Sequence, residues 1–413
     1  MIPQKKIVIF TGGTTTPITP HLSLCAPAYG TIGQKIAEAI SNHPQNKMET
    51  VLIRTKMAGG DSLSTNEDLL KAAKEVVADY STKIVFMTAA VCDFEVDAID
   101  GGDISFFRDK RLSSDRDYEF WVKGTQKILP IFREKRKDIF LVAFSTTSNA
   151  SKEEMFLKAQ RVMKQNSANL VVANDIGTRK NFIATPEESI YSETEDRDIL
   201  VKELVEISLL RSNLTFTRST VVDGKPISWN DDRVPPALRK VVDYCIEQGA
   251  YKPIQGKTAG HFAIRLSDTE FLTSIRKTDF NDLKDVGLVY VKTDGPDTVL
   301  AYGAKPSVGG QSQRIVFKDH PGKDCIVHFH CPKKEDSDIP VVSQREYECG
   351  SHECGKNTSR GLKYYLDGKI AAVMLDNHGP NIVFSKNEDP EVVIEFIKNH
   401  FDLSKKTGPS WDK

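Results

Sequence analysis

Two histidines one residue apart mark the segment with the clearest chemical potential. His328 and His330 close a strongly apolar run. Because side chains alternate along a β-strand, both imidazoles would project to one face while Val327 and Phe329 project to the other. Zinc and similar ions take three or four such ligands, and His378, which precedes a glycine, is the natural third. Two hydrogen-bonded core histidines would produce the same pattern, so the pair by itself leaves both interpretations open.

Further motifs accompany these histidines in order along the chain. They are residues 258–265 (TAGHFAIR), Asp294-Gly295, Lys305-Pro306-Ser307, His328-Phe329-His330 and His378-Gly379. The series resembles the class II aldolase/adducin head family over roughly residues 234–403. The resemblance implies an α/β/α domain, usually in a ring-forming homo-oligomer, that polarises a phosphorylated ketose or aldehyde on Zn²⁺ or a similar ion. The implied ligands are His328, His330 and His378. The implied substrate-site residues are Gly260, Lys305, Ser307 and, as a proton donor across a subunit interface, Tyr347.

The chain departs from that family in its acid/base group. At unchanged spacing from His328, the position of the family's glutamate falls on Gly309, which has no proton to transfer. The adducin branch retains the fold without catalysis, so the departure questions the reaction and not the domain. A segment with Cys349, His352 and Cys354 has no clear counterpart. It would add a ligand or an acid/base group, or it would simply start a helix that Ser351 caps.

Length and charge bound the rest of the chain. The 413 residues suffice for two or three domains, and 56 Lys+Arg balance 57 Asp+Glu. A balanced charge argues against nucleic-acid and membrane partners, so we expect small-molecule substrates. The absence of a signal-peptide pattern and of any run of about 20 apolar residues leads us to expect a cytoplasmic protein. Seven scattered cysteines, an odd count, are typical of free thiols.

The first apolar run, residues 6–10, ends in a glycine turn. Gly12, Gly13 and Thr14 follow it directly, and a second glycine pair, Gly30 and Gly33, opens a helical pattern. Glycines let backbone N–H groups approach an anion closely. Neither stretch fits the dinucleotide or Lys-bearing phosphate motifs. A plain strand-to-loop turn and a nucleotide site therefore both remain open for this region.

Similar apolar runs recur along the first half of the chain. They cover residues 51–53, 84–90, 140–144 and 170–175. Helical periods fill the gaps, for example residues 67–79 and 152–166. The alternation predicts a doubly wound, Rossmann-like parallel α/β sheet with its ligand at the carboxyl ends of the strands.

The segments at these strand ends resemble the phosphopantothenoylcysteine synthetase (phosphopantothenate–cysteine ligase) family over roughly residues 5–211. The matching segments are Gly12-Gly13-Thr14, residues 89–94 (AAVCDF), residues 110–114 (KRLSS) and residues 172–175 (VAND) followed by Phe182. The resemblance implies that CTP or ATP with Mg²⁺ activates a pantothenate carboxylate, which cysteine then attacks. It implies nucleotide and substrate contacts at Gly12, Gly13, Thr14, Gly30, Gly33, Ala90, Asp93, Phe144, Asn174, Asp175 and Phe182.

Lys110 is the implied catalytic residue of this half, on a mobile loop that closes over the nucleotide phosphates. A positive charge there would stabilise the pyrophosphate leaving group. The alternative is a solvated loop charge in the run 108–111 (RDKR). A family asparagine that contacts the acyl intermediate is replaced here by Ala26, which cannot donate or accept through its side chain. Nucleotide binding would survive this change while the amide-forming pocket is altered.

The sequence predicts two domains, residues 1–212 and 234–413, joined by a polar linker at 213–233. Three functions stay open. The first is a ligase of coenzyme A biosynthesis fused to a zinc-binding domain, and the second is a metal-dependent lyase or isomerase. The third is a binding or scaffold protein in which both sites are degenerate. Both resemblances imply a homo-oligomer.

Overall fold

The computed structural model describes residues 4–307 and 311–407, which fall into two compact units. Unit 1 contains the chain up to Pro186 together with Tyr191–Ser212. Unit 2 contains the short segment Glu187–Ile190 together with the chain from Asn213 onwards. No helix in the described residues is long and apolar enough to cross a membrane.

Unit 1 is built on a seven-stranded sheet whose central strands are parallel. In spatial order its strands are β12 (Ile190–Thr194), β11 (Asn181–Ala184), β10 (Leu170–Asp175), β9 (Phe140–Thr147), β5 (Thr82–Met87), β1 (Lys6–Thr11) and β4 (Glu49–Arg54). Counting only the parallel strands, the order is 2-1-3-4-5, which is a doubly wound topology. The predicted Rossmann-like sheet is confirmed, and its topological switch point lies between β1 and β5.

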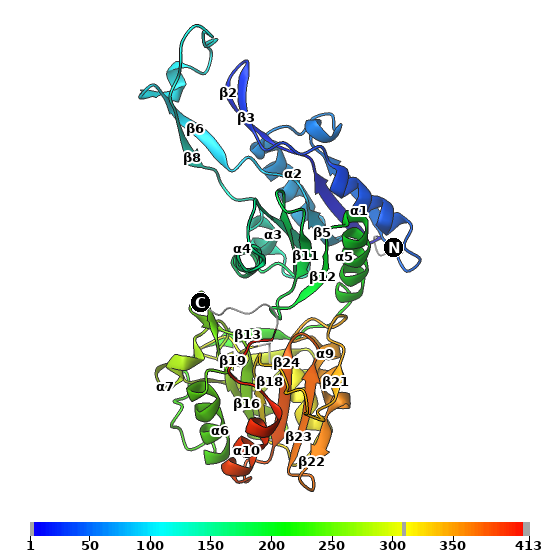
Figure 1. Ribbon diagram of the computed structural model, residues 1–413, viewed down its shortest axis with the longest axis vertical. Helices are drawn as coiled ribbons and strands as arrows, with labels where there is room; N and C mark the ends of the chain where they lie inside the picture. Colours follow the sequence, from blue (N-terminus) through cyan, green and yellow to red (C-terminus); the bar gives the residue numbers. More distant parts are fainter. Residues whose placement is uncertain (1–3, 308–310, 408–413) are drawn as a thin grey trace. The chain divides into compact units, whose positions relative to one another are not determined.

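Helices cover both faces of this sheet (Figure 1). They are α1 (Thr31–Ser41), α2 (Asn66–Ala78), α3 (Ile131–Lys135), α4 (Lys152–Asn166) and α5 (Arg197–Arg211). α1 and α5 share one apolar cluster with Ile7 and Ile9, whereas Phe10 points to the other face and packs on Phe132 of α3. α2 and α4 each begin with a capping box, built on Thr65 and Ser151, which satisfies their first N–H groups.

Two small β-sheets extend from the main sheet of unit 1 (Figure 1). One is the hairpin of β2 (Thr15–Thr19) and β3 (Leu22–Cys25); the other is a three-stranded arm of β6 (Phe94–Ile99), β7 (Gly102–Asp103) and β8 (Phe120–Gly124). A small cluster around Ile18, Val96 and Ile99 packs the hairpin against the arm. Lys110 lies on this arm, in the connection between β7 and β8.

Unit 2 is built on a ten-stranded, mostly antiparallel sheet. Its path runs β13 (Arg218–Val222), β19 (Thr298–Tyr302), β18 (Leu288–Thr293), β17 (Glu270–Ser274), β16 (His261–Arg265), β20 (Cys325–His328), β24 (Gly379–Phe384), β23 (Ile370–Leu375) and β21 (Val341–Val342), with β22 (Lys363–Tyr365) beside β23. A separate short pair consists of β14 (Pro253–Ile254) and β15 (Lys257–Thr258). Residues 213–233, expected as a linker, contribute β13 to the sheet.

Helices on both faces make unit 2 a three-layer α/β/α structure, as predicted. They are α6 (Pro236–Glu247), α7 (Leu283–Val286), α8 (Gln311–Asp319), α9 (His352–Gly361) and α10 (Pro390–His400). The larger apolar cluster joins α6 and α10 to Val327 and Phe329 of the sheet. The smaller one joins α8 to Ile326 on the opposite face. Strand alternation therefore places His328 beneath α8 and α9, away from the larger core.

Candidate functional site

The three predicted ligands of unit 2 come together in the structure. One ring nitrogen from each of His328, His330 and His378 lies within 4.8 Å of the others, and all three side chains are buried. Nε2 of His328 is 3.2 Å from Nε2 of His378. Two nitrogens bound to one tetrahedral zinc ion lie about 3.3 Å apart, as Zn–N bonds of about 2.0 Å require. The spacing of this pair therefore fits a shared ion.

Hydrogen bonding and burial prepare the histidines to bind a cation. Nδ1 of His328 donates to the carbonyl of Pro380 at 2.7 Å, which leaves Nε2 with its lone pair directed at His378. Burial lowers the pKa of His328 to about 4, although the bond to Pro380 opposes this shift. Burial and the neighbouring histidines hold the pKa of His330 well below its usual value. His328 and His330 are therefore neutral near pH 7, the form in which imidazole ligates metals.

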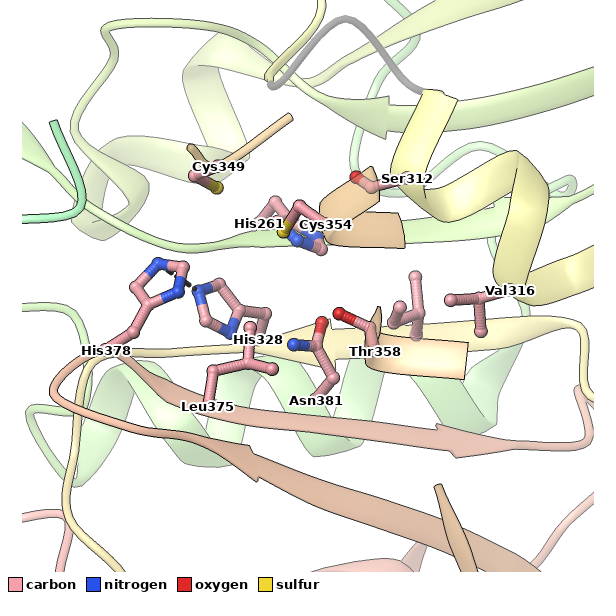
Figure 2. Close-up of a pocket in the computed structure, with 11 residues that line it drawn as sticks. His261, Ser312, Val316, His328, Cys349, Cys354, Thr358, Leu375, His378 and Asn381 are labelled. Carbon is pink, nitrogen blue, oxygen red and sulfur yellow. Dashed lines mark hydrogen bonds between the residues drawn. The ribbon is translucent and has the colours of Figure 1, made fainter. Parts of the chain in front are cut away.

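A small cavity of about 10 Å³ lies beside His328 and His378. Figure 2 shows His328 and His378 facing each other, with Cys349 and Cys354 across the cavity. A volume of this size holds about one water molecule. The cavity therefore has room for an ion or a water molecule beside His328 and His378.

The backbone beside the cluster depends on one glycine. Gly260 has φ +108°, and a Cβ atom there would lie 2.6 Å from the carbonyl oxygen of His328. Ser307 reaches the same place and donates its hydroxyl to the carbonyl of Gly260 at 3.5 Å. Lys305 accepts a backbone hydrogen bond from Arg276. Gly260 and Ser307, both predicted substrate residues, are thus adjacent, while Gly309 falls outside the described residues.

The predicted helix cap in the segment before α9 is confirmed. Ser351 caps α9 and accepts from the N–H of Cys354 at 3.0 Å. Tyr347, the expected proton donor, is partly buried in the preceding loop and is not among the residues that line the cavity. Cys349 and Cys354 do line it, whereas His352 contacts Thr217 instead.

In unit 1 the switch point of the sheet brings two predicted loops together. Gly13 forms a bridge with Ala90, and the N–H of Thr14 donates to the carbonyl of Ala90 at 3.0 Å. The hydroxyl of Thr14 accepts from the N–H of Cys92 at 2.9 Å and donates to Asn66. Ligands of doubly wound sheets bind at such a crevice. The loops after β1 and β5 are therefore joined where a nucleotide would be expected.

Close packing explains why glycine occupies several positions in the loops after β1 and before α1. Gly12 has φ +97°, and a Cβ at Gly13 would lie 2.0 Å from the carbonyl oxygen of Ala26. Gly30 is the N-cap of α1 without a side-chain cap, and a Cβ at Gly33 would lie 2.3 Å from the hydroxyl of Thr11. The free N-terminus of α1 leaves its backbone donors available for an anion.

The predicted site residues on and after β9 and β10 are of two kinds: some are buried and have a structural role, and Asn174 is partly exposed. Asp175 is buried, and its carboxylate accepts from the backbone N–H groups of Asn149, Ala150, Gly177 and Thr178. Asn174 is partly exposed and accepts from the hydroxyl of Thr146 at 3.0 Å. Phe182 is buried against Phe156, and Phe144 packs on the core of α1 and α5.

The charged residues predicted for this site lie in the solvent. Lys110 is exposed on the arm, with its ammonium 6.0 Å from the ring centre of Phe107. Asp93 is exposed at the start of the arm and pairs with Lys127 at 2.6 Å. Ala26 packs against Gly13 and donates its N–H to the carbonyl of Thr14. The methyl side chain of Ala26 cannot form a hydrogen bond at the candidate nucleotide site.

The sequence analysis did not predict three residues that lie at the two sites. Asn66 links the loops of unit 1, because its amide also donates to the carbonyl of Cys92 at 2.7 Å. His261 stacks beside His328, with ring centres 4.8 Å apart. Glu188 lies 3.8 Å from Nδ1 of His330. His261 had a signal, because it lies in the TAGHFAIR motif, whereas nothing in the sequence links position 188 to position 330.

Comparison with known proteins places a family match on the first half of the chain. The sequence model of the DNA/pantothenate metabolism flavoprotein C-terminal domain matches residues 2–204. The bifunctional coenzyme A biosynthesis protein CoaBC of Thermococcus kodakarensis is 26% identical over 188 residues, which cover 43% of this chain and 44% of that relative. The chain thus spans less than half the length of the curated relatives it matches.

Solved structures give similarities of two kinds. The DNA/pantothenate metabolism flavoprotein of Streptococcus pneumoniae is 22% identical, with a TM-score of 0.41 and coverage of 50% of this chain and 97% of that one. The L-fuculose-1-phosphate aldolase of Thermus thermophilus is 20% identical, with a TM-score of 0.29 and coverage of 40% of this chain and 88% of that one.

Proposed function

We propose that unit 1 is a phosphopantothenate–cysteine ligase and that it is fused to a metal-binding domain. The family match to residues 2–204 carries this proposal. It is supported by the location of the predicted residues, because Gly12 to Thr14 and Ala90 meet at the switch point of a doubly wound sheet. The curated relatives are bifunctional coenzyme A biosynthesis proteins, and this chain spans less than half of each.

The chemistry assigned to unit 1 has two steps. The carboxylate of the pantothenate compound attacks the α-phosphorus of CTP or ATP, forming an acyl-nucleotide and releasing pyrophosphate. The amine of cysteine then attacks the acyl carbon, and the nucleoside monophosphate leaves as the amide forms. The uncapped N-terminus of α1 would bind phosphate oxygens, since the N–H groups of Gly13 and Thr14 already donate to the carbonyls of Ala28 and Ala90. Bound Mg²⁺ would neutralise charge on the triphosphate. Lys110 would stabilise the leaving pyrophosphate when the arm approaches.

The decisive experiment is pyrophosphate release by the full chain with 4′-phosphopantothenate, cysteine and either CTP or ATP. We expect release that requires all three compounds, and a fall of about 100-fold in the rate for Lys110→Ala. Arg111→Ala is the matched control, because Arg111 is the exposed neighbouring cation, and it should change the rate by less than about 3-fold. Nucleotide binding without pyrophosphate release would refute the ligase and leave unit 1 as a binding domain in which Ala26 has removed the reaction.

A second function is favoured by the histidine cluster of unit 2. We propose that His328, His330 and His378 bind one divalent ion, Zn²⁺ by their chemistry, since nitrogen ligands at tetrahedral spacing suit this metal. When bound, such an ion would act as a Lewis acid or as a structural link between strands. Elemental analysis of the purified chain should find about one zinc per chain, and His328→Ala should lose it. Equal metal content in both proteins would refute the site.

A further inference from the structure

A carboxylate from outside the aldolase-like motifs lies at the histidine cluster. Oε2 of Glu188 is 3.8 Å from Nδ1 of His330, and Glu188 is only 2% exposed. Among the described residues, the ring nitrogens within 4.8 Å of one another are those of the three histidines, so the carboxylate lies beside His330 at the margin of this group. Glu188 belongs to the short segment Glu187–Ile190, which the structure assigns to unit 2.

Several contacts hold this segment in place. Glu187 accepts the backbone N–H of Cys349 at 2.6 Å. Ser189 donates its hydroxyl to the carbonyl of Asn377, the residue before His378. The segment is therefore fixed at both sides of Glu188, next to the strand turn that carries the third histidine.

Glu188 has an unusual backbone conformation and a buried negative charge. Its φ is +63°, a left-handed conformation that asparagine and glycine adopt far more readily than glutamate. Its carboxylate is buried, and burial of a carboxylate is costly unless cations or donors surround it. Lys406, itself buried, forms an ion pair with Oε2. Carboxylates that ligate metals usually have such a second hydrogen-bonding partner, which orients them.

We infer that Glu188 is the fourth ligand of the divalent ion held by His328, His330 and His378. This inference rests on the proposed metal site of unit 2. Three neutral imidazoles and one carboxylate complete a tetrahedral set, and sites with four protein ligands are structural, whereas catalytic zinc keeps one position open. In this arrangement the ion links the segment Glu187–Ile190 to the sheet of unit 2.

Cobalt(II) titration of the chelator-stripped full chain tests this inference, because four-coordinate Co²⁺ absorbs visible light far more strongly than six-coordinate Co²⁺. The wild type should give the intense spectrum of a four-coordinate ion. Glu188→Gln should weaken affinity by at least about 10-fold and change the spectrum. Glu187→Gln is the matched control, since it alters the neighbouring carboxylate but keeps an oxygen acceptor for Cys349. It should bind Co²⁺ within about 2-fold of the wild type.

A second variant guards against misfolding, because Glu188→Gln removes the negative charge that faces Lys406. Glu188→Asp keeps the charge but withdraws the carboxylate by one methylene group, and it should also weaken affinity about 10-fold. Unchanged affinity and spectrum in both variants, with binding lost in His328→Ala, would overturn the role of Glu188 and retain the three-histidine site. Failure of the wild type to bind Co²⁺ or Zn²⁺ would overturn both proposals.

Discussion

The candidate site of unit 1 consists mainly of backbone from two strand-end loops, whereas that of unit 2 consists of side chains from distant parts of the chain. At the first, the buried residues Gly12 to Thr14 meet Ala90 at the carboxyl ends of β1 and β5, and the charged residues predicted to act there are exposed. At the second, His328, His330 and His378 lie together beside a cavity of about 10 Å³.

The difference shows how each site depends on the fold. Backbone donors at a strand end are positioned by the sheet itself, so many side chains around them can change without loss of binding. A set of buried imidazoles works only if each side chain is present and each neighbour leaves it room. We therefore expect nucleotide binding by unit 1 to tolerate substitution of the surrounding polar side chains, and metal binding by unit 2 to respond sharply to substitution of its histidines.

The largest predicted effect comes from one glycine in each unit. Gly13→Ala would place a Cβ 2.0 Å from the carbonyl oxygen of Ala26, and Gly260→Ala would place one 2.6 Å from that of His328. Each should destabilise its own unit by about 3 kcal/mol, since backbone cannot move away cheaply. Hydrogen exchange measured by mass spectrometry should locate the loss in unit 1 for Gly13→Ala and in unit 2 for Gly260→Ala.

Gly256→Ala is the control for this pair. Gly256 also has a positive φ, +68°, but a Cβ there meets no atom within 4 Å, so the change should cost only about 1 kcal/mol. Binding should separate the units as well: Gly13→Ala should weaken nucleotide binding and spare Co²⁺ binding, and Gly260→Ala should do the reverse. Loss of both ligands in either variant would contradict the independence of the two sites.

A smaller effect, dependent on pH, is predicted for Asp175→Asn. Hydrogen bonds from Thr178, Ala150 and Thr147 hold the pKa of Asp175 well below its usual value, despite burial. A depressed folded pKa means that this carboxylate stabilises unit 1 above its unfolded pKa of about 3.9, and that the stabilisation disappears as the pH falls through the folded value. Asp175→Asn should therefore unfold at lower urea concentration than the wild type at pH 7.

The same comparison at low pH provides the check. The difference between the urea midpoints of the two proteins should narrow as the pH is lowered from about 5 towards about 2, without vanishing, because the folded pKa of Asp175 is strongly depressed. A constant difference across this range would show that Asp175 acts through packing and not through its charge.

The smallest predicted effect concerns Asn66, which joins the two loops of unit 1. Asn66→Ala removes its bonds to Thr14 and to the carbonyl of Cys92, at 2.6 Å and 2.7 Å, and should cost about 1 kcal/mol. The Kd for nucleotide, measured by calorimetry, should rise by less than about 10-fold, because the backbone donors remain. Thr125→Ala removes a neighbouring bond to Cys92 and one weak bond from Asn66 but keeps the Asn66 bonds to Thr14 and Cys92, so it should have a smaller effect. A loss of binding above about 100-fold would mean that this site also depends on individual side chains.

Much of the fold follows from local patterns in the sequence. The apolar runs at residues 6–10, 140–144 and 170–175 became β1, β9 and β10, and the period at residues 152–166 became α4. Such prediction succeeds because buried parallel strands and amphipathic helices each leave a short-range signature. The alternation at His328 was equally local: Val327 and Phe329 enter the larger core, and His328 faces the other side.

The sequence alone thus determined the two α/β units, the glycine turns at the strand ends and the three histidines as a possible ligand set. Tertiary structure decided what surrounds them. Asp175, expected at a ligand, instead accepts hydrogen bonds from its own loops, and Lys110 lies on an exposed arm. Only the packed structure brings position 188 beside position 330, because burial, a left-handed backbone and an ion pair with Lys406 depend on contacts between residues far apart in the chain.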